Sequence, residues 1–363
     1  LLKGSAAPVT YKSEGLASLL GLENLWITFS GYWPERGAGM TTCTFKETEA
    51  YSVCGRMSPD LNKTLVLASA GNTSRSFAKV CSENNIPLLL FVPEDYIGNL
   101  WFESPLDPCV KLICSRSGSD YYDAIYLSEI VASLDQYIPE GGAKNIARRD
   151  GMATCVLSAV TTIGAIPEYY FQAVGSGTGA VAAWEANLRF LEDGRFGNTK
   201  MKLMVSQNEP FIPIYEAWKA GSRSMLPMDN ITARKWVEKI DAKVLSNRKP
   251  PYPIAGGLYD ALTDSGGDVL TATNKEARVA AEIFKEYEKI DIHIAAAVAS
   301  ASLIKAIKNN QVDRKALIML NITGGGEERF KAGKELYYLK PDIIFDIDPD
   351  PEVVKTEIQK LTY

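Results

Sequence analysis

One lysine stands where an ordinary surface lysine would be poorly placed. Lys46 lies in the stretch TTCTFKETEAY (41–51), after small hydroxyl residues and directly before Glu47 and near Glu49. Threonine caps exposed helix amides and acidic residues suit a first turn, so this stretch predicts a helix that begins close to Lys46. The positive end of such a helix disfavours an ammonium group. Lys46 is therefore either a solvated lysine that the glutamates screen or an amine with a chemical function.

A turn of small residues follows the apolar run TLVLA and could bind a ligand. This turn, SAGNTSRSFA (69–78), carries Asn72, whose amide both donates and accepts hydrogen bonds. Ligands of open α/β sheets collect at the carboxyl ends of strands, where the turn is predicted to lie. The alternative is that Asn72 only caps the next helix.

A glycine-rich turn, VGSGTGAVAAWEA (174–186), separates another predicted strand from a predicted helix. Its small residues are Gly175, Ser176, Gly177, Thr178 and Gly179. Successive amides and the helix dipole at such a turn hold a phosphate. The turn lacks the GK[ST] of a Walker A motif and is not a clean GxGxxG, so we expect a small phosphorylated cofactor rather than a nucleotide. A tight structural turn is the alternative. A third turn, LNITGGG (320–326), ends an apolar strand at Thr323.

The elements that must position these residues alternate between strands and helices. Apolar runs such as IPLLLFVP (86–93) and MKLMVSQN (201–208) are separated by segments with helical periodicity, such as YYDAIYLSEIVASL. This alternation predicts an α/β fold with mostly parallel sheets. A TIM barrel shares the alternation, but the clustered glycine turns favour two open α/β layers around a cleft. RKPPYPIAGG (248–257) is predicted to be a surface connection, and the tail is predicted to end in a helix.

Composition excludes several classes of function. The 363 residues carry a net charge of −5, which gives no electrostatic basis for nucleic-acid binding. No apolar run reaches the roughly 18 residues of a membrane helix, and no signal-peptide pattern opens the chain. The cysteines form no CxxC pair and His293 is the only histidine, so we expect no metal site. We expect buried free thiols, a reducing cytoplasm, and His293 packed at a strand-to-helix join.

The motifs together carry a resemblance that none carries alone. FSGYWPERGAGMTTCTFKETEAY, ASAGNTSRSFA, GSGTGAVAAWEA and a late strand ending in Thr-Gly occur in this order. This set resembles the fold-type II pyridoxal-phosphate enzymes, the tryptophan synthase β and threonine synthase group, over nearly the whole chain. The resemblance implies two open α/β domains with largely parallel sheets around a cofactor cleft. It also implies a large discontinuous domain, 1–57 with 161–363, and a smaller inserted domain, 58–160.

The resemblance assigns roles position by position, with pyridoxal 5′-phosphate as cofactor. Lys46 takes the place of the lysine that binds the cofactor covalently and acts as base, and Asn72 that of the partner of its 3′-oxygen. The GSGTG turn takes the 5′-phosphate, and Thr323 the pyridine nitrogen. NIARRDG aligns with the NPYRxEG of threonine synthases. Arg148 therefore falls where an arginine holds the substrate phosphate, and Asn145 is predicted to assist it.

One departure from threonine synthases decides the expected reaction. The acidic and basic residues that follow their lysine are replaced here by Glu47, Thr48 and Glu49. The chain is most similar to the cysteate-forming branch of the group, which implies exchange of the phosphate of O-phosphoserine for sulfite, in coenzyme M biosynthesis. The resemblance also implies a homo-oligomer. The alternatives are a threonine synthase acting on O-phosphohomoserine, a sulfide-using enzyme like cysteine synthase, and, in a different class, a non-catalytic ligand-sensing α/β module.

Overall fold

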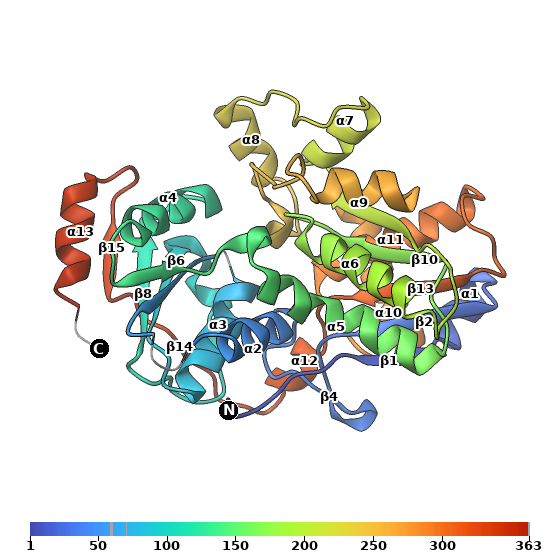
Figure 1. Ribbon diagram of the computed structural model, residues 1–363, viewed down its shortest axis with the longest axis horizontal. Helices are drawn as coiled ribbons and strands as arrows, with labels where there is room; N and C mark the ends of the chain where they lie inside the picture. The colour runs from blue at the N-terminus through green and yellow to red at the C-terminus, as the bar shows by residue number, and fades with distance from the viewer. Residues whose placement is uncertain (59–60, 70, 362–363) are drawn as a thin grey trace. The chain divides into compact units, whose positions relative to one another are not determined.

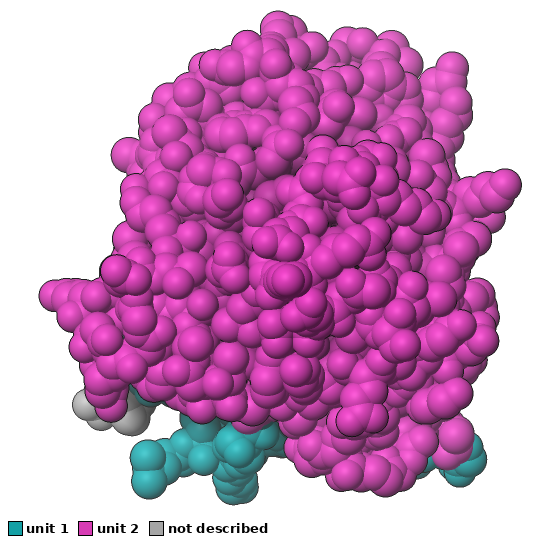
Figure 2. All heavy atoms as spheres, turned by 90° about the vertical axis from the view of Figure 1, so that its right-hand side faces the viewer, with its two compact units in different colours: residues 1–6, 46–151, 333–363 teal, residues 7–45, 152–332 magenta. Residues whose placement is uncertain are grey.

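The computed structural model describes residues 1–58, 61–69 and 71–361 (Figure 1). The chain divides into two compact units. Unit 1 consists of Leu1–Ala6, Lys46–Gly151 and Gly333–Tyr363, and unit 2 of Ala7–Phe45 and Met152–Ala332, coloured separately in Figure 2. Ala70, part of the predicted SAGN turn, lies outside the described residues. Both units alternate strands with helices, as the sequence predicts.

Unit 2 contains a six-stranded sheet in the order β1-β2-β13-β10-β11-β12. Only β1 runs antiparallel to its neighbour, and the other pairs are parallel. The strands are β1 (Val9–Lys12), β2 (Asn24–Phe29), β10 (Tyr169–Ala173), β11 (Lys202–Asn208), β12 (Asp268–Ala272) and β13 (Leu317–Ile322). Because β10 and β13 are adjacent and parallel, the turn that follows β10 and the turn that follows β13 leave the same edge of the sheet.

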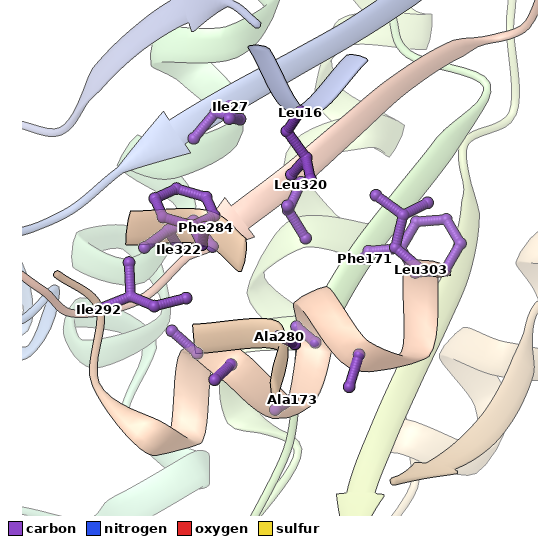
Figure 3. Close-up of a cluster of buried hydrophobic side chains, with 14 of the residues drawn as sticks. Leu16, Ile27, Phe171, Ala173, Ala280, Phe284, Ile292, Leu303, Leu320 and Ile322 are labelled. Carbon is purple, nitrogen blue, oxygen red and sulfur yellow. The ribbon is translucent and has the colours of Figure 1, made fainter. Parts of the chain in front are cut away.

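Helices cover both faces of this sheet because side chains alternate along each strand. Leu320 and Ile322 point into a core with α10 and α11 (Figure 3), whereas Met319 joins the opposite core with α6 and α9. The helices are α1 (Gly15–Leu20), α6 (Thr178–Asp193), α7 (Pro213–Lys219), α8 (Asn230–Val237), α9 (Leu258–Ser265), α10 (Asn274–Glu288), α11 (Ile294–Lys308) and α12 (Glu327–Lys331). A short pair, β3 (Tyr32–Trp33) and β4 (Ala38–Gly39), completes the unit.

Unit 1 contains a parallel five-stranded sheet in the order β15-β8-β6-β5-β9. Its strands are β5 (Thr64–Ala68), β6 (Leu88–Pro93), β8 (Val110–Ser115), β9 (Tyr137–Pro139) and β15 (Ile343–Phe345). Alternate residues of β5 again serve two cores: Leu65 and Leu67 pack with α2 and α3, and Val66 packs with α4 and α13. The helices are α2 (Lys46–Gly55), α3 (Asn72–Glu83), α4 (Tyr121–Ala132) and α13 (Pro351–Gln359). A second pair joins β7 (Trp101–Phe102) to β14 (Tyr337–Tyr338).

The predicted α/β class with largely parallel sheets is confirmed, as are the helix that begins at Lys46 and the final helix. The compact units differ from the predicted domain ranges. Helix α2 belongs to unit 1 because it packs on α3, and the chain end belongs there because β15 pairs with β8. Helix α5 (Ile146–Ile163) begins in unit 1 and continues into unit 2. The predicted surface connection is wrong at Tyr252, which is 0% exposed within the core of unit 2.

Candidate active site

Lys46 is the first residue of α2 and is not a solvated lysine. Its side chain is only 17% exposed, and its Nζ lies 3.0 Å from Oε2 of Glu49. Burial lowers the pKa of Lys46 below the ordinary lysine value, and the Glu49 carboxylate opposes that shift. A buried amine with a lowered pKa is available in its neutral, nucleophilic form more readily than a surface lysine is. This environment suits covalent attachment to a carbonyl group.

Glu49 connects Lys46 to Arg148 on α5. The other carboxylate oxygen of Glu49, Oε1, lies 2.7 Å from Arg148 Nε, and Nη1 of Arg148 lies 2.7 Å from Oε2 of Glu140. Burial opposes the charge on Arg148, but Glu140 and Glu49 outweigh it and raise the pKa of the guanidinium. Burial also raises the pKa of Glu140, and Arg148 opposes that shift. We call these four side chains the charge cluster of unit 1.

The side chain of Asn145, the residue before α5, forms hydrogen bonds with backbone groups. Its Oδ1 accepts from the amide of Ala147 at 2.9 Å, and its Nδ2 donates to the carbonyl of Glu140 at 2.6 Å. Both ends of the amide therefore stabilise the entry to α5. Asn145 and Arg148, which the sequence predicts to bind the substrate phosphate, both make these contacts within unit 1.

Asn72 begins α3, and its amide is oriented by Arg75 one turn later. Arg75 Nη2 donates to Asn72 Oδ1 at 3.1 Å, and Nη1 donates to the carbonyl of Asn99 at 2.8 Å. The guanidinium of Arg75 also stacks 4.1 Å from the ring centroid of Trp101. Because a guanidinium can only donate, the Asn72 atom that faces it must be the amide oxygen. The Nδ2 group is then directed away from Arg75, where it can donate to a ligand oxygen.

The glycine-rich turn in unit 2 joins β10 to the start of α6. Gly177 has φ of +82°, a left-handed conformation that favours glycine, and Ser176 Oγ lies 2.8 Å from Thr178 Oγ1. A Cβ at Gly175 would lie 3.1 Å from the Cα of Leu245, so a larger residue there would require the neighbouring backbone to shift. A glycine cradle at the amino end of a 16-residue helix fits a phosphate group.

A buried polar network lies behind this turn. Gln172 on β10 accepts hydrogen bonds from the hydroxyl of Tyr170 and, at 3.2 Å, from Nδ2 of Asn321 on β13. Asn321 also donates to the Tyr170 hydroxyl at 2.8 Å. A Cβ at Gly179 would lie 2.6 Å from Nε2 of Gln172, so the amide packs directly beneath the turn. The network fixes the turn to the two strands at whose ends the candidate residues lie.

Thr323 follows β13, and its carbonyl is bound by the segment that leads to Lys46. It accepts from the amide of Phe45 at 2.9 Å and from Thr44 Oγ1 at 3.2 Å. His293 precedes α11, donates its amide to the carbonyl of Gly324 at 3.0 Å, and places Nε2 2.9 Å from Glu327. The prediction that His293 packs at the start of a helix is confirmed, but the preceding element is helix α10 rather than a strand, with an isolated bridge at Ile292 between the two helices.

Comparison with known proteins decides which cofactor this arrangement serves. Residues 12–324 match the family model described as pyridoxal-phosphate dependent enzyme. The chain belongs to the pyridoxal-phosphate dependent enzyme family. A lysine of lowered pKa fits the aldehyde of that cofactor, and a glycine-rich turn at a helix start fits a phosphate group such as the one it carries. The predicted cofactor is confirmed, and so is the prediction of an enzyme rather than a ligand-sensing module.

Relatives within the family share most of the chain. A protein of Methanosarcina acetivorans named cysteate synthase is 47% identical over 360 residues, which cover 99% of this chain and 86% of the relative. One of the same name from Methanocella paludicola is 47% identical over 357 residues, which cover 98% of this chain and 82% of the relative. The predicted membership of the cysteate-forming branch is confirmed.

Solved structures show the same fold at low sequence identity. Maize serine racemase has a TM-score of 0.65 at 13% identity, and the match covers 88% of each chain. A mutant of O-ureido-L-serine synthase, bound to O-ureido-L-serine, has a TM-score of 0.63 at 10% identity, and the match covers 98% of this chain and 97% of the other. No helix in the described part of this enzyme is long and apolar enough to cross a membrane.

Several residues that surround the candidate site are not predicted from the sequence. Glu140 and the Tyr170–Gln172–Asn321 network lie in no motif, and Arg75 lies in the SAGNTSRSFA turn without a predicted role. The sequence places Glu49 at a helix start, as a carboxylate that could screen Lys46 and as a departure from threonine synthases, but it does not predict the contact with Arg148; a carboxylate three residues after a lysine can reach it on a helix. That spacing was the one available signal for the charge cluster.

Proposed function

We propose that this enzyme converts O-phospho-L-serine and sulfite into L-cysteate and phosphate. The observation that carries the proposal is the 47% identity, over 99% of the chain, to a protein named cysteate synthase. We assign the reaction to coenzyme M biosynthesis and the enzyme to a homo-oligomer. We also assign it to a reducing cytoplasm, a compartment that suits its cysteines, which are free thiols in the described structure.

Four parts of the chain would hold the cofactor. Lys46 would bind it covalently, Asn72 would donate Nδ2 to its 3′-oxygen, and the amides of residues 175–179 would bind its phosphate. The Thr323 hydroxyl would face the pyridine nitrogen. When bound, pyridoxal phosphate accepts the electron pair left on Cα when the proton departs, which allows the group on Cβ to leave.

Lys46 would also move the proton. Its amine, released when the substrate amine replaces it, takes the proton from Cα and later returns it. The lowered pKa of Lys46 supports this role, because a base must be unprotonated before it can accept a proton. A neutral hydroxyl at Thr323, in place of a carboxylate, would hold the pyridine nitrogen without protonating it, and this would favour loss of the β-group.

Product identification tests this function. The purified enzyme, loaded with pyridoxal phosphate, is given O-phosphoserine with sulfite, and phosphate release and amino-acid products are measured by chromatography and mass spectrometry. We expect L-cysteate and phosphate in equal amounts, and no product from a Lys46→Ala variant. O-phosphohomoserine and sulfide are supplied in parallel reactions. Threonine or cysteine as the dominant product would contradict the proposal while leaving the cofactor assignment intact.

A further inference from the structure

Glu49 occupies an unusual place in the charge cluster. Its side chain is 0% exposed, and its two oxygens meet two different cations, Lys46 at 3.0 Å and Arg148 at 2.7 Å. Arg148 in turn meets Glu140, whose side chain is 4% exposed. The cluster therefore contains two cationic and two acidic side chains, all within unit 1. Tyr121, at the start of α4, is the further titratable group beside Arg148, and burial raises the pKa of its hydroxyl.

The position of Glu49 on the helix explains why it is needed. Lys46 is the first residue of α2, where the helix dipole repels an ammonium group and favours a carboxylate. Burial penalises the ammonium further. A carboxylate one turn along the same helix opposes both effects and fixes the direction of the Lys46 side chain. Removing that carboxylate would leave Lys46 and Arg148 as two cations, with Glu140 as the remaining carboxylate of the charge cluster.

We propose that Glu49 is the positioning residue of Lys46, and that Arg148, anchored by Glu140, holds the Glu49 carboxylate against the Lys46 amine. This inference rests on the proposed role of Lys46 as the cofactor lysine and base. Whenever its amine is not linked to the cofactor, Lys46 Nζ returns to Glu49 Oε2. After the amine takes the Cα proton, Glu49 stabilises the ammonium until the proton is returned. Arg148 then acts on Lys46 through Glu49.

The charge balance of the cluster predicts that two substitutions change the pKa of the Lys46 amine in opposite directions. A neutral side chain at position 49 removes the anion beside Lys46, so the ammonium is destabilised. A neutral side chain at position 148 removes a cation, so the ammonium is stabilised. An opposite charge within contact shifts a pKa by about 1–3 units, and we expect shifts of that size in opposite directions. A role in folding alone does not predict opposite signs.

Competitive labelling of the enzyme without cofactor measures this directly. Acetic anhydride is applied over a range of pH, and acetylation of Lys46 is quantified by peptide mass spectrometry, with exposed Lys12 as the internal reference. We expect Glu49→Gln to lower the pH of half-maximal labelling and Arg148→Gln to raise it. The double variant Glu49→Gln/Arg148→Gln keeps one cation and one anion, Lys46 and Glu140, and should return towards the value of the unchanged enzyme.

Glu47→Gln is the matched control, because Glu47 is a buried carboxylate in the same helical turn. It pairs with Lys79 at 3.2 Å rather than with Lys46. In this variant the pH of half-maximal labelling of Lys46 should stay within a few tenths of a pH unit of its value in the unchanged enzyme. Arg148→Lys keeps the charge, so its pH of half-maximal labelling of Lys46 should stay close to that of the unchanged enzyme. This variant is measured in place of Arg148→Gln if Arg148→Gln does not fold. Shifts of the same sign in Glu49→Gln and Arg148→Gln, or an equal shift in Glu47→Gln, would overturn the proposal.

Labelling is independent of the reaction that the enzyme catalyses. A second measurement follows the visible absorbance that appears when pyridoxal phosphate is added to each variant. If Glu49 positions Lys46, linkage formation in Glu49→Gln is slower at high pH, where both enzymes present a neutral amine. Equal rates there would contradict the positioning role. A product other than cysteate would overturn the proposed function without changing either result.

Discussion

Gly179 is a position in the phosphate turn where one added methyl group should disturb the packing. The Cβ of a Gly179→Ala variant would lie 2.6 Å from Gln172 Nε2 and 3.0 Å from Oε1, whereas ordinary van der Waals contact begins at 3.4 Å. A glutamine without partners would move aside, but Gln172 is held by Tyr170 and Asn321. The variant must either strain the helix start or break those hydrogen bonds. Overpacking of this kind costs about 1–3 kcal/mol of unfolding free energy.

Thermal unfolding and cofactor titration test this reasoning. For a unit of this size, each kcal/mol corresponds to roughly 2–4 °C in Tm, so Gly179→Ala should lower Tm by about 2–12 °C. It should also weaken binding of pyridoxal phosphate, followed by quenching of tryptophan fluorescence. Gly39→Ala is the control, because a Cβ there meets nothing within 4 Å. Adding Gln172→Ala to Gly179→Ala should cost less than the sum of the two single changes. If Gly179→Ala unfolds at the same temperature as Gly39→Ala, the turn is not packed as described.

Three further outcomes follow from the site. Lys46→Ala should abolish the visible absorbance of bound cofactor, whereas Lys12→Ala should retain it; a borohydride-stable cofactor adduct on Lys46→Ala would identify another lysine as the attachment point. Arg75→Met should weaken cofactor binding about tenfold, roughly 1.4 kcal/mol, because Asn72 loses the donor that orients its amide. The same change in an Asn72→Ala background should have no further effect on that affinity, and an equal loss there would show that Arg75 acts elsewhere. Labelling of Lys46 should extend to lower pH than labelling of Lys12, because burial lowers the pKa of the Lys46 amine, and identical profiles would show that it is solvated.

The sequence predicts those parts of the site that depend on neighbours along the chain. The helix start at Lys46, the strand–glycine–helix turn and the strand that ends before Thr323 all follow from local propensity and periodicity. The charge cluster does not, because Glu49 and Arg148 are brought together by the packing of helices far apart in the sequence. The NIARRDG motif aligns Arg148 with a phosphate-binding arginine and gives no sign of its contact with Glu49. An acidic residue at position 49 is already explained by its place in the first turn of a helix, so the sequence gives no reason to expect a partner for it.

Burial of single side chains and pairing of distant strands also depend on residues far apart in the sequence, so local patterns do not predict them. Tyr252 lies in a segment whose prolines and glycines are typical of a surface loop, yet its ring packs edge-on to Tyr259 at 5.7 Å. Proline and glycine restrict the backbone but do not determine whether a neighbouring aromatic side chain is covered. The pairing of β15 with β8 likewise leaves no local signal, because a parallel partner can come from anywhere in the chain.

The pairing of β15 with β8 has a consequence for how the chain folds as it is synthesised. Strand β8 is complete at Ser115, but the strand that covers its outer edge is not made until Ile343–Phe345. At about 5–20 residues per second, the ribosome needs on the order of ten seconds or more to span that interval. Throughout it, the largely buried strand VKLICS presents unpaired amides and carbonyls, the kind of edge that recruits strands from other chains. Unit 1 is therefore most exposed to aggregation before its last thirty or so residues emerge, whatever the stability of the finished enzyme.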